Sequence, residues 1–181
     1  MSMLDFAINA TTEYIDHMPK SQRKKYGQFF TSKETAAFMA ELFEIPNERQ
    51  TLSILDPGAG SGILSIALLE RLQAFSVIKE IRLVCYENDP NVMELLRANL
   101  EVACSQSRQK ISCEIVSDNY ILGQATDYNL MLGANLEPEK FDFVIGNPPY
   151  MKIAKDAPEA LAMPDVCYGA PNLYFLFASM S

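Results

Sequence analysis

Apolar residues in this chain fall into short continuous runs that alternate with longer stretches of helical spacing. The short runs are typical of buried strands and cover residues 52–55, 81–86, 111–116 and 141–145. The helical stretches cover residues 1–18, interrupted at Thr11 and Thr12, then 32–43, 63–72, 90–100, and a last helix from residue 172. Alternating strands and helices predict an α/β fold with a doubly wound, mostly parallel sheet.

Two stretches lack either pattern. Residues 121–139 show no clear periodicity, and residues 151–171 contain three prolines and a glycine. We expect the first to be a connecting segment and the second to be a loop over the functional site.

A glycine-rich turn, Asp56-Pro57-Gly58-Ala59-Gly60-Ser61-Gly62, joins the first predicted strand to the helix at 63–72. A strand, a tight glycine loop and a helix form the nucleotide-binding half of a βαβ unit, because glycine lets the backbone approach a ligand closely. The spacing is neither that of a dinucleotide phosphate loop nor that of a P-loop. The loop therefore favours a ligand with no phosphate at this point.

Two acidic residues follow the next two strands. Glu87 ends the second strand, where a carboxylate can accept hydrogen bonds from both hydroxyls of a ribose. The alternative is an exposed acid beside the helix that Asp89 and Pro90 begin. Asp118 follows the third strand, where it could accept a hydrogen bond from the amine of an adenine or simply cap the next segment.

The fourth strand runs into Asn147-Pro148-Pro149-Tyr150. The prolines fix an extended backbone and have no N–H to donate, so the groups on offer are the Asn147 amide oxygen and the Pro148 carbonyl, with the Tyr150 ring beyond. Two acceptors beside an aromatic ring suit a planar ligand that carries an NH₂ group. A proline-rich turn that merely closes a strand is the alternative.

Composition limits the function further. The chain has 181 residues and a formal net charge of −8, which is unexpected for a protein that grips nucleic acid by itself. The one basic cluster could touch phosphates or be a solvated face: Lys20, Arg23, Lys24 and Lys25. No apolar run has the length of a membrane span, and no signal-peptide pattern is present.

Cysteine and histidine argue against metal and disulfide chemistry. The four cysteines show neither metal-ligand spacing nor a disulfide framework, and the single histidine is His17. We therefore expect no metal, core thiols at Cys85 and Cys113, and a cytoplasmic location.

With these motifs identified, the chain resembles the amino-group DNA methyltransferases, in particular the adenine-N6 enzymes of restriction-modification systems in the gamma arrangement. The resemblance begins at about Tyr26 and rests on six motifs in the family's order. They are Gly27 to Thr31 (motif X), Asp56 to Gly62 (motif I), Glu87 to Pro90 (motif II), Asp118 (motif III), Asn147 to Tyr150 (motif IV) and Asn172 to Phe177 (motif V).

The resemblance implies S-adenosylmethionine as the methyl donor and DNA as the partner. It places the donor on residues from motifs X, I, II, III and V. Glu87 would contact the ribose, and Asp118 and Phe177 would contact the adenine. The other donor-binding residues would be Thr31, Asp56, Gly58, Ala59, Gly60 and Gly62. It places a flipped-out adenine on Asn147, Pro148, Pro149 and Tyr150. Hydrogen bonds from the adenine amine to Asn147 and Pro148 would aim the nitrogen lone pair at the methyl group.

The resemblance also implies a domain organisation. We expect an N-terminal helical segment and basic linker at 1–25, and a methyltransferase domain at 26–181 that lacks its C-terminal strands and a target recognition domain. The strand at 141–145 would then be a sheet edge that self-associates. Two other readings stay open. One is a cofactor-binding fragment that does not methylate alone, and the other is a methyltransferase acting on a protein glutamine amide.

Overall fold

The computed structural model describes residues 1–19, 30–133, 139–167 and 169–180. These residues form two compact units. Unit 1 comprises Met1–Ser117 and Phe141–Asn147, and unit 2 comprises Asp118–Lys140 and Pro148–Ser181. The predicted boundary at residue 25 and the basic cluster lie outside the described residues.

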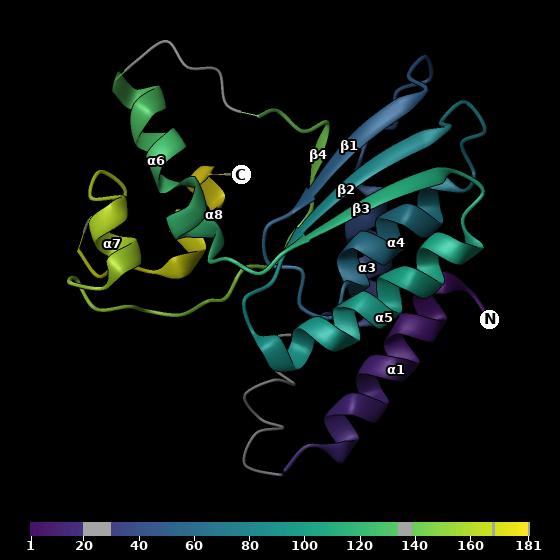
Figure 1. Cartoon of the computed structure of the whole chain (residues 1–181), viewed down its shortest axis with the longest axis horizontal. Helices are drawn as coiled ribbons and strands as arrows, with labels where there is room; N and C mark the ends of the chain where they lie inside the picture. The colour runs from purple at the N-terminus through teal and green to yellow at the C-terminus, as the bar shows by residue number, and fades with distance from the viewer. Residues whose placement is uncertain (20–29, 134–138, 168, 181) are drawn as a thin grey trace. The chain divides into compact units, whose positions relative to one another are not determined.

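Unit 1 contains a parallel sheet in the order β3-β2-β1-β4 (Figure 1). Its strands are β1 (Thr51–Asp56), β2 (Glu80–Tyr86), β3 (Lys110–Val116) and β4 (Phe143–Val144). Helices α1 (Met3–His17), α3 (Lys33–Glu41), α4 (Ile63–Leu72) and α5 (Pro90–Gln106) belong to the same unit. The prediction of an α/β fold with a parallel sheet is confirmed, and β1 lies between β2 and β4.

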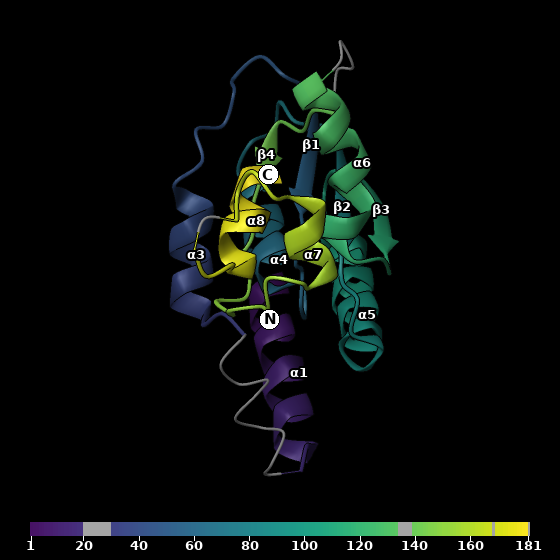
Figure 2. The same ribbon diagram turned by 90° about the vertical axis from the view of Figure 1, so that its left-hand side faces the viewer.

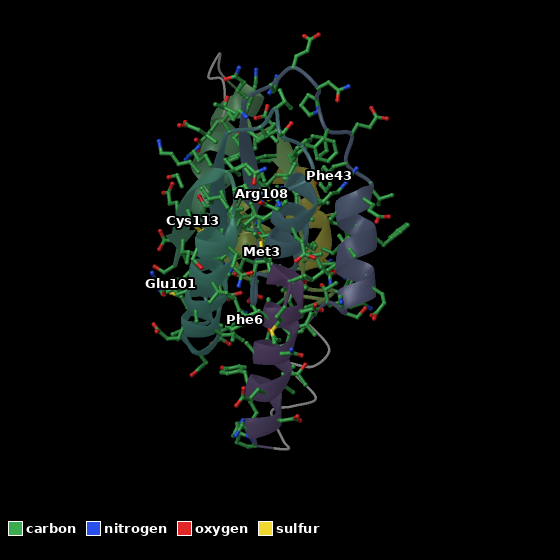
Figure 3. All side chains as sticks on the ribbon, turned by 90° about the vertical axis from the view of Figure 1, so that its right-hand side faces the viewer. Met3, Phe6, Phe43, Glu101, Arg108 and Cys113 are labelled. Atoms are coloured by element: carbon green, nitrogen blue, oxygen red, sulfur yellow. The ribbon has the colours of Figure 1, made fainter. Side chains whose placement is uncertain are left out.

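One row of side chains across the sheet shows how the core is built. The register aligns Leu83 of β2 with Cys113 of β3 and with Ile54 of β1, and Ile54 in turn with Phe143 of β4. Every residue of α4 from Ile63 to Leu69 is buried, as expected for a helix packed on several sides. Phe43, labelled in Figure 3, packs its ring edge-on against Phe143 with centroids 5.0 Å apart.

Sequence signals account for the ends of several helices. Ser32 caps α3 by accepting a hydrogen bond from the Thr35 N–H (3.2 Å). Asp89 accepts one from the Asn91 N–H (2.9 Å), so the predicted start of α5 at Asp89 and Pro90 is confirmed. The expected interruption of the first helix is wrong. α1 runs without a break from Met3 to His17, and the Thr12 hydroxyl is accommodated within it by donating to the Ile8 carbonyl (2.8 Å).

Unit 2 contains helices α6 (Tyr120–Gly133), α7 (Pro158–Ala162) and α8 (Leu173–Met180) (Figure 2). The predicted connecting segment at 121–139 is therefore wrong over most of its length, because Asn119 caps α6 by accepting from the Leu122 N–H (3.2 Å). α7 also interrupts the predicted loop at 151–171. Ile121 of α6, Met163, and Leu173 and Leu176 of α8 form a separate small core.

The structure also corrects the expectations for Cys113 and for the strand at 141–145. Cys85 is buried as predicted, but Cys113, labelled in Figure 3, is exposed because β3 is an edge strand. The apolar run 141–145 contributes only Phe143 and Val144 to the sheet, although the Asp142 and Ile145 N–H groups still bond to β1. Among the described residues, no helix combines the length and apolarity needed to cross a membrane.

Candidate functional site

The glycine loop of unit 1 follows β1 and is tied to the end of β2. The Ala59 N–H donates to the Tyr86 carbonyl (2.9 Å), and the Gly62 N–H donates to the Ala59 carbonyl (2.8 Å). Gly60 and Gly62 have φ values of +55° and +83°, in the left-handed region that favours glycine. The loop thus takes the tight conformation that its sequence predicts.

Space around the loop differs from one glycine to the other. A Cβ at Gly62 would lie 2.9 Å from Leu96 Cδ1, whereas a Cβ at Gly60 would lie 3.8 Å from the Phe30 ring. The buried Asn99 amide of α5 donates to the Ser61 carbonyl (2.9 Å) and so links the loop to this helix. Gly62 is therefore packed against α5, and Gly60 faces the aromatic ring that precedes Thr31.

Glu87 lies immediately after β2 and contacts the same loop. Its Oε2 accepts from the Gly60 N–H (2.9 Å), and its Oε1 accepts from the Asp89 N–H (2.7 Å). Burial raises the pKa of Glu87, and these backbone donors oppose that rise. The carboxylate is therefore fixed between the loop and the start of α5, and each oxygen keeps a lone pair for a further donor. Its ribose-binding role stays a prediction.

Asp56 is fully buried at the end of β1. Its Oδ2 accepts from the Ser65 hydroxyl of α4 (2.7 Å). Among the described residues, its Oδ1 has no hydrogen-bond partner. Burial raises the pKa of Asp56 from 3.8 to about 7. Asp56 supports the loop from inside, and its predicted contact with the donor stays a prediction.

β4 brings Gly146 and Asn147 beside the glycine loop. A Cβ at Gly146 would lie 3.2 Å from Pro57 Cδ, so a side chain here would require the Pro57 ring to shift by a few tenths of an ångström. Asn147 Nδ2 donates to the Thr31 hydroxyl (3.4 Å), an arrangement that leaves the Asn147 Oδ1 as the acceptor of the carboxamide. Strands β1 and β4 flank the point where the strand order reverses, which is where ligands bind in open α/β sheets.

Unit 2 holds the remaining predicted site residues. Tyr150 is 72% exposed, and its ring stacks on Tyr174 with centroids 4.8 Å apart. Phe177 is half-buried, with its ring 5.5 Å from that of Tyr120, and Asp118 is exposed just before α6. Pro148 and Pro149 are half-buried, and the Pro149 carbonyl accepts from the Met151 N–H (2.9 Å). The predicted roles of these residues stay predictions.

The structure thus divides the predicted site between the units. Unit 1 holds Thr31, Asp56, Gly58, Ala59, Gly60, Gly62, Glu87 and Asn147; unit 2 holds Asp118, Pro148, Pro149, Tyr150 and Phe177. Sequence reasoning missed the supporting residues Phe30, Ser65, Asn99 and Tyr174. Phe30 and Tyr174 had a local signal, because they lie within the stretches matched to motifs X and V. The described residues contain no group of three or more His, Cys, Asp or Glu that could hold a metal ion.

The sequence is similar to a family of DNA methylases and to two type II methyltransferases. The sequence model of the family described as N-6 DNA Methylase matches residues 10–160. The chain is 30% identical over 172 residues to Type II methyltransferase M.PstI of Providencia stuartii, covering 91% of this chain and 32% of that protein. It is 28% identical over 165 residues to Type II methyltransferase M.BsuBI of Bacillus subtilis, covering 88% of this chain and 31% of that protein.

A solved structure agrees at the level of the fold. The methyltransferase subunit of a type I restriction-modification system from Streptococcus thermophilus superposes with a TM-score of 0.54 at 18% identity, covering 84% of this chain and 32% of that one. The chain spans about a third of the length of each of the two type II methyltransferases and of this subunit.

Proposed function

Because the chain belongs to the N-6 DNA methylase family, we propose that it is the catalytic domain of a DNA methyltransferase that modifies the N6 amine of adenine. The methyl donor in this proposal is S-adenosylmethionine, which supplies an electrophilic methyl group when bound. The observation that carries the proposal is the carboxamide of Asn147, whose nitrogen donates to Thr31 while its oxygen is left as an acceptor beside the glycine loop.

The residues of unit 1 fit such a donor. The loop from Gly58 to Gly62 has two positive-φ glycines and no phosphate-binding spacing, so it offers close backbone approach to an uncharged or cationic group. Glu87, held by two backbone N–H groups, would accept from the ribose hydroxyls. Thr31 and the loop from Gly58 to Gly62 would lie along the methionine part, and Asp118 and Phe177 of unit 2 would contact the adenine of the donor.

The target amine needs a different set of groups. An adenine amine is a weak nucleophile because its lone pair is delocalised into the ring. The Asn147 Oδ1 and the Pro148 carbonyl would each accept one N–H, which favours a pyramidal nitrogen with a directed lone pair. The exposed Tyr150 ring would stack on the base. Pro148 and Pro149 restrict the backbone that precedes Tyr150 and would so fix its position. A base in a duplex must be flipped out to reach these groups.

We further propose that residues outside this chain make the sequence-specific contacts with DNA. With a net charge of −8, this chain is a poor match for the phosphate backbone, so we assign base recognition to a target recognition domain outside it. β4 pairs with β1 on one side and is the last strand of the sheet, which supports self-association of this chain through that edge. A cytoplasmic location, where thiols stay reduced, completes the proposal.

The acidic charge also favours a second candidate, a cofactor-binding segment that transfers no methyl group without other parts of the enzyme. The two are separated by measuring donor binding and methyl transfer on the same preparation. Calorimetry reports the affinity for S-adenosylmethionine. Tritium counting after incubation with labelled donor reports transfer to long DNA free of methylated adenine, or to a protein with an exposed glutamine loop.

Each outcome decides between the candidates. Label in DNA supports the proposed function, and donor binding without transfer supports the second candidate. Label in the protein would assign the chain to glutamine-amide methylation instead. A chain that is folded by circular dichroism yet binds no donor would overturn the proposal.

A further inference from the structure

Tyr150 presents an exposed ring with one face already covered. Its side chain is 72% exposed, yet the ring lies nearly parallel to that of Tyr174, with centroids 4.8 Å apart and planes inclined by 15°. A base inserted between two rings would need them about 7 Å apart, twice an ordinary contact distance. A nucleobase can therefore reach only the outer face of Tyr150.

Tyr174 is itself held in place. Its backbone N–H donates to Asn172 Oδ1 (3.0 Å), and its ring meets the edge of the Phe175 ring with centroids 5.8 Å apart. Its neighbours along α8, Leu173 and Leu176, are buried in the small core of unit 2. The backbone of Tyr174 is thus held by the Asn172 cap, and the helix that carries it is anchored by Leu173 and Leu176.

The backbone connects the two tyrosines directly. Lys152 and Asn172 form an antiparallel bridge. On either side of it, the Leu173 N–H donates to the Met151 carbonyl (2.9 Å) and the Ile153 N–H donates to the Pro171 carbonyl (3.0 Å). This short ladder brings the residues after Tyr150 alongside the residues before Tyr174, although the tyrosines are far apart in the sequence.

We propose that Tyr174 is a positioning residue: it covers the inner face of Tyr150 and presents the outer face for stacking of the target base. This inference rests on the proposed function, in which Tyr150 stacks on that base. An exposed tyrosine loses rotamer freedom when a base settles on it, and Tyr174 removes that cost in advance. Loss of the Tyr174 ring should therefore weaken base binding about 3- to 10-fold, the effect of freeing one side chain.

The test uses the full chain and a short single-stranded oligonucleotide that carries one 2-aminopurine, a fluorescent base that is quenched when it stacks on tyrosine. A single strand requires neither duplex recognition nor flipping, and the chain has no Trp to interfere with the signal. The variants are Tyr174→Leu, Tyr174→Phe, Phe175→Leu, Tyr150→Ala and the double variant Tyr150→Ala with Tyr174→Leu. Tyr174→Met replaces the leucine variant if the latter does not fold.

We expect Tyr150→Ala to reduce quenching more than any other single variant while leaving a measurable remainder, and Tyr174→Leu to weaken binding within the range above. Tyr174→Phe, which keeps the ring, should bind as the wild type does. Phe175→Leu should change binding less than Tyr174→Leu, because Phe175 contacts Tyr174 only by its edge. In the Tyr150→Ala background, Tyr174→Leu should cause no further loss, because Tyr174 acts through Tyr150.

The remaining outcomes separate two kinds of failure. If Tyr150→Ala reduces quenching but Tyr174→Leu leaves it unchanged, the positioning role is wrong and the proposed function stands. A further loss in the double variant would mean that Tyr174 touches the base itself, which also contradicts positioning. If Tyr150→Ala leaves quenching at the wild-type level, both the stacking role of Tyr150 and this inference fail.

Discussion

Replacing the buried Asp56 by asparagine should flatten the pH dependence of the free energy of unfolding. The folded chain keeps a proton on Asp56 up to about pH 7, because burial raises the pKa of this carboxyl. The unfolded chain releases that proton near pH 3.8, the ordinary value. Between these values the folded state binds more protons than the unfolded state, so stability falls as pH rises and levels off above about 7.

The structure sets the size of this effect. A pKa raised from 3.8 to about 7 corresponds to about 4 kcal/mol, at about 1.4 kcal/mol for each pKa unit. This is an upper limit, since relaxation around an ionised buried group lowers the cost. Asparagine keeps the shape of Asp56 and can still accept from the Ser65 hydroxyl through its amide oxygen. The variant should thus lose the pH-dependent cost without losing that contact.

Urea unfolding followed by circular dichroism at about pH 4.5, 6 and 7.5 measures the difference between wild type and variant. We expect Asp56→Asn to gain stability relative to the wild type as pH rises through this range. Glu101→Gln, which changes an exposed carboxylate on α5 (Figure 3), serves as the control and should show no such trend. A difference between wild type and Asp56→Asn that stays constant with pH would refute the reasoning.

Three further predictions concern the site and its loop. Glu87→Ala should weaken donor binding by about 1–3 kcal/mol through lost charge-assisted hydrogen bonds, and unchanged affinity in calorimetry would remove Glu87 from the site. Asn147→Ala should slow methyl transfer about 10²–10³-fold with little change in donor affinity. Turnover near the wild-type rate would contradict the role of its oxygen. Gly62→Ala should cost about 1–3 kcal/mol of stability, because φ is +83° and the new Cβ would crowd α5. Gly123→Ala, in open space on α6, should stabilise by about 0.5–1 kcal/mol, and equal effects of the two alanines in urea unfolding would contradict the loop argument.

The features that the sequence predicted correctly are those with local causes. The glycine loop, the start of α5 at Asp89 and Pro90 and the parallel α/β sheet each follow from turn chemistry, helix capping or strand alternation. Such signals lie within a few residues of one another, so they can be identified without knowing the fold.

The errors have causes that are not local. The helix α6 was missed because Gly123 and polar residues hide its periodicity, while burial of Tyr120 and Ile121 and the Asn119 cap stabilise it. Cys113 was expected in the core because its strand reads as apolar, but only the strand order shows that β3 is an edge.

Supporting contacts within the site were also beyond the sequence. Asp56 with Ser65, Ser61 with Asn99, and Tyr150 with Tyr174 each join residues on different elements. Nothing in their spacing indicates a contact, because each pair is brought together by packing of a helix on the sheet or by the ladder in unit 2.

The most direct test of the account is to determine which atom receives the methyl group. The chain is incubated with S-adenosylmethionine that carries a deuterated methyl group and with long DNA free of methylated adenine, and the DNA is digested to nucleosides for mass spectrometry. The account predicts deuterated N6-methyldeoxyadenosine, and its near disappearance with Asn147→Ala. Deuterium on cytosine, or no labelled nucleoside from a chain that binds the donor, would contradict it.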